Sequence, residues 1–187
     1  MNYLQKIIVT IFLMLFTACG TGETQERINT DLGFDMWDYM TSARSYEVEY
    51  DVYENGVKTD FYVETHQQFG EKYERESEGG LTTLRLRSNT ILMDEPNIST
   101  TIRRFLHLGE QEVFQSNAIE NCILDNFHEI YENQGSIFHN VLQVTCNSRS
   151  GVYQEFYYGY NEGIVAIYEK EGALRTEYIK VGEKEIY

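Results

Sequence analysis

The sequence predicts a mainly β protein with a short N-terminal helix, in which an antiparallel sheet curls into an open barrel or a sandwich. Strand-like segments recur at short spacing after residue 30, and turn residues separate them. Aromatic residues that favour strands are abundant, with 15 Tyr and 10 Phe among 187 residues. No repeat or long linker follows residue 30, so we expect a single domain over residues 31–187.

A short amphipathic helix is expected at the start of this domain. The apolar residues that share one helical face within TDLGFDMWDYMTSARS are Leu32, Met36, Tyr39, Met40 and Ala43. Thr30 or Asp31 can cap the first turn. We therefore expect this helix to lie on a larger sheet.

The following segment, residues 46–64, predicts a β-hairpin. Apolar and acidic residues alternate along YEVEYDVY, and Asn55-Gly56 is the dipeptide most typical of a two-residue hairpin turn. The residue pairs that such a turn sets are Glu54 with Val57, Val52 with Thr59, Tyr50 with Phe61 and Val48 with Val63. In this register the apolar residues of both strands share one buried face.

The same register places carboxylates opposite each other on the second face of the hairpin, where Asp51 meets Asp60 and Glu47 meets Glu64. Like charges directly opposite are unfavourable. Either this face is fully hydrated or its oxygen atoms hold a cation such as calcium.

Further strands follow in quick succession. The segments expected to form them are Lys72 to Glu76, Leu81 to Arg87, Thr90 to Met93, Thr100 to Leu106, Ile137 to Cys146, Val152 to Tyr158, Ile164 to Lys170 and Leu174 to Val181. Residues 118–131 fit a helix or a strand equally well. The last strands predict a meander of antiparallel hairpins because short turn sequences connect them.

Residues 1–18 predict a removable signal peptide. Ile7 to Ala18 is an uncharged run of twelve residues, which is shorter than the about 20 residues that a membrane-spanning helix needs. The run ends at Thr17-Ala18-Cys19, which resembles the lipobox of bacterial lipoprotein precursors, although Phe16 stands where leucine is usual. The resemblance implies a diacylglycerol thioether on Cys19 and an acylated amino terminus.

That resemblance implies a protein anchored in the cell envelope through the lipid on Cys19. Gly20 fits an outer-membrane destination, and residues 19–30 are expected to form the lipidated Cys and a flexible tether. The membrane is then a partner through the anchor, and the domain faces the periplasm. The alternative is an ordinary secreted protein with a free thiol at Cys19.

The acidic charge balance excludes some classes of partner. The chain has 15 Lys and Arg against 30 Asp and Glu, and loss of Lys6 with the leader leaves 14 against 30, a net charge of −16. Such a surface is repelled by nucleic acid and by anionic headgroups. We expect no nucleic-acid partner, and the charge either confers solubility or attracts cations or a basic protein.

The two cysteines within the domain, Cys122 and Cys146, are expected to form a disulfide bond in an oxidising compartment. A catalytic or metal-binding role is the alternative, although neither cysteine has the spacing of a ligand motif.

No sequence motif for catalysis or cofactor binding is present. The one local grouping that could support a hydrolase is Asp125, His128 and Glu129. We therefore expect a protein that is not an enzyme and that needs no cofactor or metal.

Tyrosine-rich strands favour a ligand cavity inside a curled sheet. Along VYQEFYYGY, alternation sends Tyr157 to one face and Phe156 and Tyr158 to the other. The residues expected to line such a cavity are Tyr46, Tyr50, Phe61 and Tyr157. The alternative is that these tyrosines are ordinary strand residues with one solvated edge.

The leading functional hypothesis is a lipid-anchored, non-catalytic envelope protein that binds or scaffolds an unknown protein or small hydrophobic ligand. The first alternative is a carrier of a hydrophobic ligand or a lipoprotein, because a helix packed into a half-closed barrel resembles in outline the outer-membrane lipoprotein-sorting proteins. The second alternative is an envelope hydrolase.

Overall fold

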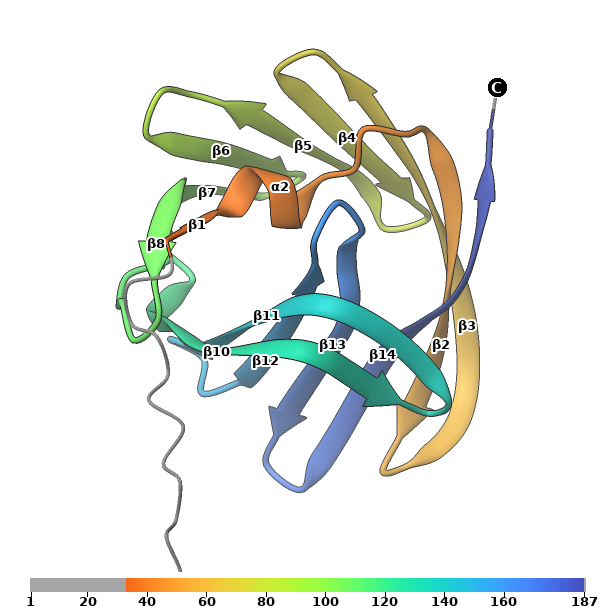
Figure 1. Cartoon of the computed structure of the whole chain (residues 1–187). Helices are drawn as coiled ribbons and strands as arrows, with labels where there is room; N and C mark the ends of the chain where they lie inside the picture. The colour runs from red at the N-terminus through yellow and green to blue at the C-terminus, as the bar shows by residue number, and fades with distance from the viewer. Residues whose placement is uncertain (1–32, 187) are drawn as a thin grey trace, which may run out of the picture. The chain divides into compact units, whose positions relative to one another are not determined.

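A computed structural model describes residues 33–186, and these residues form an antiparallel sheet that curls into a nearly closed barrel (Figure 1). The elements are β1 (Gly33–Asp35), α2 (Met36–Met40), β2 (Tyr46–Glu54), β3 (Val57–Phe69), β4 (Lys72–Ser77), β5 (Gly80–Leu86), β6 (Thr90–Glu95), β7 (Ile98–Arg103), β8 (Phe105–His107), β9 (Phe114–Gln115), β10 (Ile119–Asn133), β11 (Ser136–Ser148), β12 (Tyr153–Gly159), β13 (Gly163–Glu171) and β14 (Leu174–Glu185). The predicted fold class is confirmed, and the segments expected to be strands are extended, although Thr100 to Leu106 is divided between β7 and β8, which belong to different sheets.

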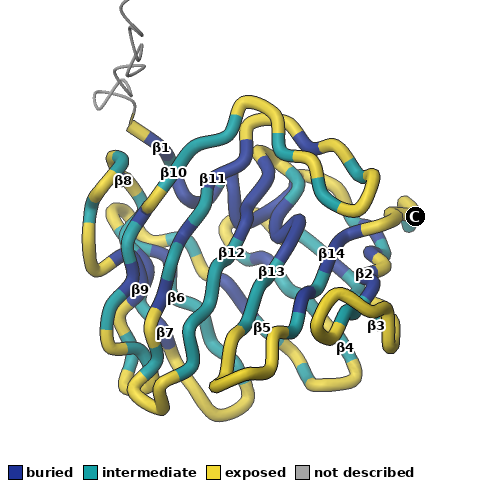
Figure 2. Tube along the Cα trace, turned by 90° about the horizontal axis from the view of Figure 1, so that it is seen from below, coloured by how far each residue is buried: buried dark blue, intermediate teal, exposed yellow. Residues whose placement is uncertain are grey.

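The main sheet has 12 strands in the order β10-β11-β12-β13-β14-β2-β3-β4-β5-β6-β7-β9. Figure 2 shows β10 to β14 and then β2 side by side. All neighbours are antiparallel, and most are consecutive in the chain, as a meander requires. The segment that could have been a helix, residues 118–131, forms most of the long strand β10.

The two ends of this sheet meet and close the barrel. Gly109 N donates to Leu124 O at 2.8 Å, and Leu124 N donates to Glu110 O at 3.0 Å. Val113 N donates to Cys122 O at 3.3 Å. This seam between β10 and residues 109–113 is short, whereas the other strand pairs are continuous ladders.

The turn between β2 and β3 forms as predicted. Asn55 and Gly56 have φ values of 50° and 82°, which are the left-handed conformations of the expected two-residue turn. Glu54 pairs with Val57 as expected.

Beyond this turn the predicted register of the hairpin is wrong by one residue. A β-bulge between Tyr53 and Val52 leaves Thr59 as the extra residue, so Tyr50 pairs with Tyr62 instead of Phe61. A shift of one residue reverses the faces of a strand. Phe61 is therefore 59% exposed, whereas Tyr50 is buried.

The helix α2 is shorter than predicted because the residues before it form strand β1 and the residue after it, Thr41, is extended. Phe34 pairs with Leu106 in the β1–β8 ribbon, so the helix begins only after this strand. Asp35, and not Thr30 or Asp31, is the N-cap, and its carboxylate accepts a hydrogen bond from Trp37 N at 3.1 Å. Thr41 is extended and ends the helix after little more than one turn.

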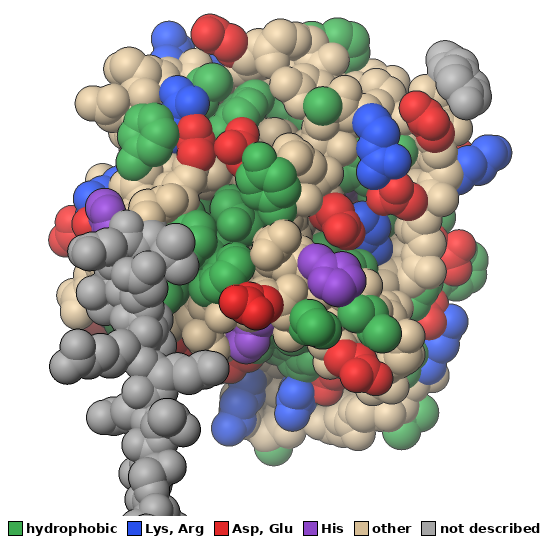
Figure 3. All heavy atoms as spheres, viewed as in Figure 1, with side chains coloured by type: hydrophobic (Ala, Val, Ile, Leu, Met, Phe, Trp, Pro, Cys, Tyr) green, Lys and Arg blue, Asp and Glu red, His purple; other side chains and the backbone are tan. Residues whose placement is uncertain are grey.

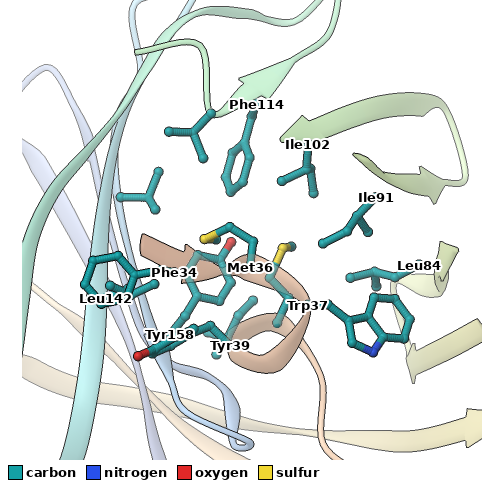
Figure 4. Close-up of a cluster of buried hydrophobic side chains, with 14 of the residues drawn as sticks. Phe34, Met36, Trp37, Tyr39, Leu84, Ile91, Ile102, Phe114, Leu142 and Tyr158 are labelled. Atoms are coloured by element: carbon teal, nitrogen blue, oxygen red, sulfur yellow. The ribbon is translucent and has the colours of Figure 1, made fainter. Parts of the chain in front are cut away.

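This helix closes one end of the barrel, which we call the helix end. Met36, Trp37 and Met40 are buried, and Figure 4 shows α2 between Leu84, Ile91 and Ile102 on one side and Leu142 and Tyr158 on the other. Asn161 N in the β12–β13 turn donates to Asp38 O at 2.7 Å. The core of the barrel therefore concentrates around α2.

The opposite end carries the turns between β2 and β3, β4 and β5, β6 and β7, β11 and β12, and β13 and β14, because antiparallel neighbours bring these turns to the same side. We call it the open end. None of the described helices has the length and apolar character needed to cross a membrane. Figure 3 shows acidic and basic side chains spread around a patch of hydrophobic side chains on the face seen in Figure 1.

Candidate ligand-binding site

A cavity of about 650 Å³ lies inside the barrel towards the open end. Its lining includes residues in or next to four turns at this end, namely Gly79, Pro96, Ser150 and Glu171, all of which are exposed. The volume lies within the range of about 300 to 1,000 Å³ that is typical of small-molecule sites. The barrel thus has one end filled by α2 and one end with room for a ligand.

The apolar part of the cavity wall comes from strands on opposite sides of the barrel. The apolar residues that line it are Tyr62, Met93, Pro96, Ile98, Phe114, Ala118, Ile119, Val152, Phe156, Tyr158, Ile164, Ile167 and Leu174. Phe114 packs edge-on against Phe156 at 5.9 Å and against Tyr158 at 6.4 Å between ring centroids. These contacts fix the rings that form one side of the cavity.

The charged part of the wall is mostly acidic. The charged residues that line the cavity are Glu64, Arg75, Glu95, Glu169 and Glu171. Gln154 Nε2 donates to Glu169 Oε1 at 2.6 Å, which holds that carboxylate in place. Among the described residues of the lining, four carboxylates therefore face one guanidinium group.

Arg75 is the single cation of this lining, and strand alternation on β4 turns it inward with Tyr73 and Ser77. Its Nε is buried and has no hydrogen-bond partner among residues 33–186. Burial lowers the pKa of Arg75, but the charge of Glu64 and the nearby tyrosines outweigh this effect and raise the pKa overall. The guanidinium group is therefore charged, with donor capacity to spare.

A buried hydrogen-bonded chain begins beside Arg75 and leads to the helix end. Glu64 Oε2 lies 3.0 Å from His66 Nε2, and His66 Nδ1 lies 2.7 Å from the Tyr73 hydroxyl. The Tyr73 hydroxyl lies 3.2 Å from that of Tyr46, and Glu162 O lies 3.1 Å from the Tyr46 hydroxyl, so the single Tyr46 proton has two acceptors within reach. This chain fixes the carboxylate of Glu64 on the cavity wall.

Burial shapes the ionisation of this chain. Burial lowers the pKa of His66, and the neighbouring charge of Arg75 acts in the same direction, although Glu64 opposes them. A neutral His66 donates from Nε2 to Glu64 and accepts from Tyr73 at Nδ1. Burial also raises the pKa of Tyr46 to about 12, so its hydroxyl remains protonated at neutral pH.

None of the four residues predicted to line a ligand cavity is among the residues that line this one. Tyr46 and Tyr50 are buried within the core below the cavity, where Tyr50 donates to Ile164 O at 3.0 Å. Phe61 faces outward because of the bulge in β3, and its place is taken by Tyr62. Tyr157 lies on the outer face of the sheet, with Phe156 and Tyr158 on the inner face.

Tyr157 belongs to an aromatic cluster outside the barrel that sequence reasoning missed. Its ring stacks on Tyr131 at 4.5 Å and meets Tyr168 edge-on at 5.4 Å. The Tyr131 and Tyr168 hydroxyls lie 3.2 Å apart, and Asn133 donates to both. A small second core thus lies on the outer face of the sheet, across β10 to β13.

The cysteines expected to pair do form a disulfide bond. Cys122 and Cys146 are directly opposite each other on β10 and β11, and both are buried. Cys19, the predicted site of lipid attachment, lies outside the described residues, as do the signal peptide and residues 19–30.

The structure does not join the residues considered for hydrolysis. His128 Nε2 lies 3.1 Å from Gln143 Oε1, and Asp125 accepts from Thr145 Oγ1 at 3.3 Å. Within the described residues, 33–186, no hydrogen bond or ion pair links Asp125, His128 and Glu129 to one another.

The carboxylate pairs considered for calcium do not form either. The bulge sets Asp51 opposite Phe61 instead of Asp60, and Glu47 opposite Thr65 instead of Glu64. Lys58 Nζ lies 2.5 Å from Asp51 Oδ1 and neutralises it. Within the described part of the chain, no group of three or more His, Cys, Asp or Glu residues is arranged to hold a metal ion.

Comparison with known proteins finds the fold but no sequence family. No family model and no curated protein matches the chain. A crystal structure of a candidate exported protein with a YmcC-like fold from Bacteroides fragilis superposes with a TM-score of 0.54 and 10% identity, over 79% of this chain and 99% of that one. The two proteins therefore share a fold.

A second crystal structure, that of a candidate lipoprotein from Parabacteroides distasonis, superposes with a TM-score of 0.45 and 7% identity, over 78% of this chain and 98% of that one.

Proposed function

We propose that the protein is a lipid-anchored, non-catalytic protein of the cell envelope that binds a small ligand in the open end of its barrel. The cavity of about 650 Å³ is the observation that carries this proposal. A barrel that served only as a scaffold would be filled by its own side chains, because protein interiors are close-packed. Here the core fills the helix end and leaves the open end hollow.

The cellular location rests on the amino-terminal sequence. The uncharged run before Cys19 and the small residues Thr17 and Ala18 support export and lipid attachment, and Gly20 supports the outer membrane as the destination. Two or three acyl chains anchor a protein firmly, so the domain stays at the membrane while its barrel faces the periplasm. The acidic surface supports partners other than nucleic acid.

Ligand binding is tested with a variant that fills the cavity. Thr82 lines the cavity, whereas Thr101 lies on the outer face of β7. The full-length protein is purified from membranes of its own host in lipid nanodiscs and analysed by native mass spectrometry. We expect a bound small molecule in the unmodified protein and in Thr101→Trp, and its loss in Thr82→Trp.

Two outcomes contradict this function. If all three proteins have the mass of the lipidated chain alone, no small molecule is bound and the proposed ligand binding is contradicted. A small molecule that Thr82→Trp retains places the ligand outside the cavity. Co-purification of a protein alone, with no small molecule, supports the scaffold alternative.

Anchoring is tested separately with Cys19→Ser. We expect the unmodified protein to incorporate labelled palmitate and to sediment with membranes, and the variant to do neither. Membrane sedimentation of an unlabelled Cys19→Ser protein would contradict a lipid anchor at this residue.

A further inference from the structure

The charges around the cavity disfavour an anionic ligand. Four carboxylates and one guanidinium group line it, and Glu95, Glu169 and Glu171 lie towards the open end, through which a ligand enters. An anion that enters from this end passes these three carboxylates first. The only cationic group that it then reaches in the lining is Arg75. The like charges raise its free energy at every step.

A cationic ligand is repelled by the charge of Arg75 deeper in the cavity. Arg75 projects from the wall formed by β4, opposite Thr82 on β5, and the neighbouring Glu64 keeps it charged. The buried Nε of Arg75 needs an acceptor, which an ammonium group cannot supply. A cation therefore fits the mouth of the cavity but not its interior.

Hydroxyl groups satisfy both kinds of wall group. A hydroxyl can accept from Arg75 and donate to Glu64, Glu95 or Glu169. Two of these carboxylates are already held in position, Glu64 by His66 at 3.0 Å and Glu169 by Gln154 at 2.6 Å. Acceptors that are fixed before binding lose little conformational entropy when a ligand arrives.

The rings between these polar groups suit a ligand with flat apolar faces. Tyr62 and Phe156 line the cavity and are half-buried, and Tyr62 is held by stacking on Tyr50 with ring centroids 4.9 Å apart. Sugar rings combine such C–H faces with hydroxyl groups around the edge. An alkyl chain would use the rings but leave the polar groups without partners.

We propose that the ligand of the open end is an uncharged oligosaccharide, with its hydroxyl groups bonded to Arg75, Glu64 and Glu169 and its ring faces against Tyr62 and Phe156. This inference rests on the proposed ligand-binding function and names the chemical class of the ligand. It also assigns the unpartnered Nε of Arg75 a role as donor to the sugar.

The test measures binding of defined probes to the full-length protein in lipid nanodiscs. An array of short uncharged oligosaccharides identifies candidates, and isothermal titration calorimetry then measures Kd for the best of them and for decanoate, decanol and decylamine, with empty nanodiscs as the blank. We expect an oligosaccharide to bind and the three alkyl probes not to bind. Because the ligand carries no charge, Kd should change less than about twofold between low and high salt.

Two arginines provide a matched pair of variants. Arg75→Met removes the donor in the cavity, whereas Arg85→Met removes an exposed guanidinium group that pairs with Asp94 on the outer face. We expect Arg75→Met to weaken oligosaccharide binding at least about tenfold, because charged hydrogen bonds are lost, and Arg85→Met to change it less than about twofold. If circular dichroism shows that Arg75→Met is unfolded, Glu169→Gln replaces it and should weaken binding several-fold.

The outcomes separate the two proposals. Binding of decanoate, decanol or decylamine without any oligosaccharide overturns the sugar assignment but leaves a ligand-binding protein. Binding of an oligosaccharide that Arg75→Met and Glu169→Gln do not weaken overturns the placement in the cavity. Binding of no probe overturns the oligosaccharide, and the native mass spectrum then decides whether ligand binding itself fails.

Discussion

His66 is the most deeply buried ionisable imidazole of the described chain, with 0% of its surface exposed. It lies between the Glu64 carboxylate and the Tyr73 hydroxyl, and burial lowers its pKa from the ordinary value of 6.5. The folded protein therefore resists a proton at this position that the unfolded chain accepts freely. Stability is then lost as the pH falls below the ordinary pKa of histidine.

This linkage predicts a pH-dependent melting temperature. Between about pH 7.5 and about pH 5.5 the unfolded state binds more protons than the folded state at His66, so the melting temperature should fall as the pH falls. His66→Gln should be less stable overall, but its melting temperature should vary less with pH in this window. Differential scanning fluorimetry at several pH values measures both.

His139→Gln is the control, because His139 is exposed on β11. This variant should keep the pH profile of the unmodified protein. If His66→Gln keeps the full slope as well, another group accounts for the pH dependence.

Single residues also show why the sequence could not locate the site. Alternation correctly separated Tyr157 from Phe156 and Tyr158, but it could not tell which set faced inward. The bulge at Thr59 reversed the assignment of Phe61, and bulges have no clear sequence signature here. The sequence did not indicate Arg75 as a site residue, because a single arginine in a strand usually faces solvent. Only the closed barrel shows that it faces the cavity.

At the scale of elements, α2 shows how five residues can organise a core. The helix is too short to be stable alone, since isolated helices shorter than about 12 residues are marginal in water. Its start is fixed by Asp35, which caps Trp37 and pairs with Arg104 at 2.6 Å between Oδ2 and Nη2. Its stability therefore comes from burial of Met36, Trp37 and Met40 in the barrel.

Truncation of the helix contact should be costly. Met36 is fully buried, so Met36→Ala should lower the free energy of unfolding by about 2 to 5 kcal/mol through lost burial and a new cavity. Chemical denaturation monitored by circular dichroism measures the change. Val57→Ala, at a residue that is 65% exposed, should change it by less than about 0.5 kcal/mol, and equal effects of the two substitutions would contradict the role of α2 as the plug of the barrel.

The disulfide between β10 and β11 stabilises the hairpin next to the seam. It joins residues 24 apart in sequence, and in the chain-entropy model such a loop contributes about 3 to 4 kcal/mol. The combined variant Cys122→Ala and Cys146→Ala should melt about 6 to 16 °C lower. Reduction of the unmodified protein should give a similar shift, and a shift below about 2 °C by both routes would show that the bond contributes little.

Strand positions were predictable because each one combines alternation with a flanking turn. The β2–β3 hairpin has both, and its turn formed at Asn55 and Gly56 as expected. The two-residue strand β9 was missed, since it exists only because β7 offers a free edge at Thr101 and Ile102. Such edge pairing depends on closure of the sheet, which local sequence does not encode.

At the scale of the whole molecule, the barrel has one weak line. The seam between β10 and residues 109–113 has few backbone hydrogen bonds, whereas β14 and β2 pair along nine residues. Local opening should therefore begin at the seam.

Hydrogen exchange followed by mass spectrometry tests this expectation. Amides of residues 109–113 should exchange well before those of β2 and β14. The β3–β4 ladder, which lies far from the seam in the sheet order, serves as the reference. Equal protection at the seam and at the β14–β2 pairing would mean that the barrel opens as one unit.

The cavity itself is a property of the closed barrel. Its lining residues come from segments between β3 and β14, so no contiguous stretch of sequence indicates the cavity. Sequence alone could supply the aromatic content and the inward alternation of each strand. It could not supply the closure that brings Phe114 to Phe156 at 5.9 Å between ring centroids.

The position of β2 between β14 and β3 has a consequence for how the chain is made. Translation delivers β2 well before β14, so one flank of this nine-residue strand has no partner until β14 has been made. A nascent chain that stalls after β13 exposes an unpaired, tyrosine-rich edge, which invites aggregation. Complete pairing of β2 therefore requires β14, and a chaperone that shields this edge until then would raise the yield of folded protein.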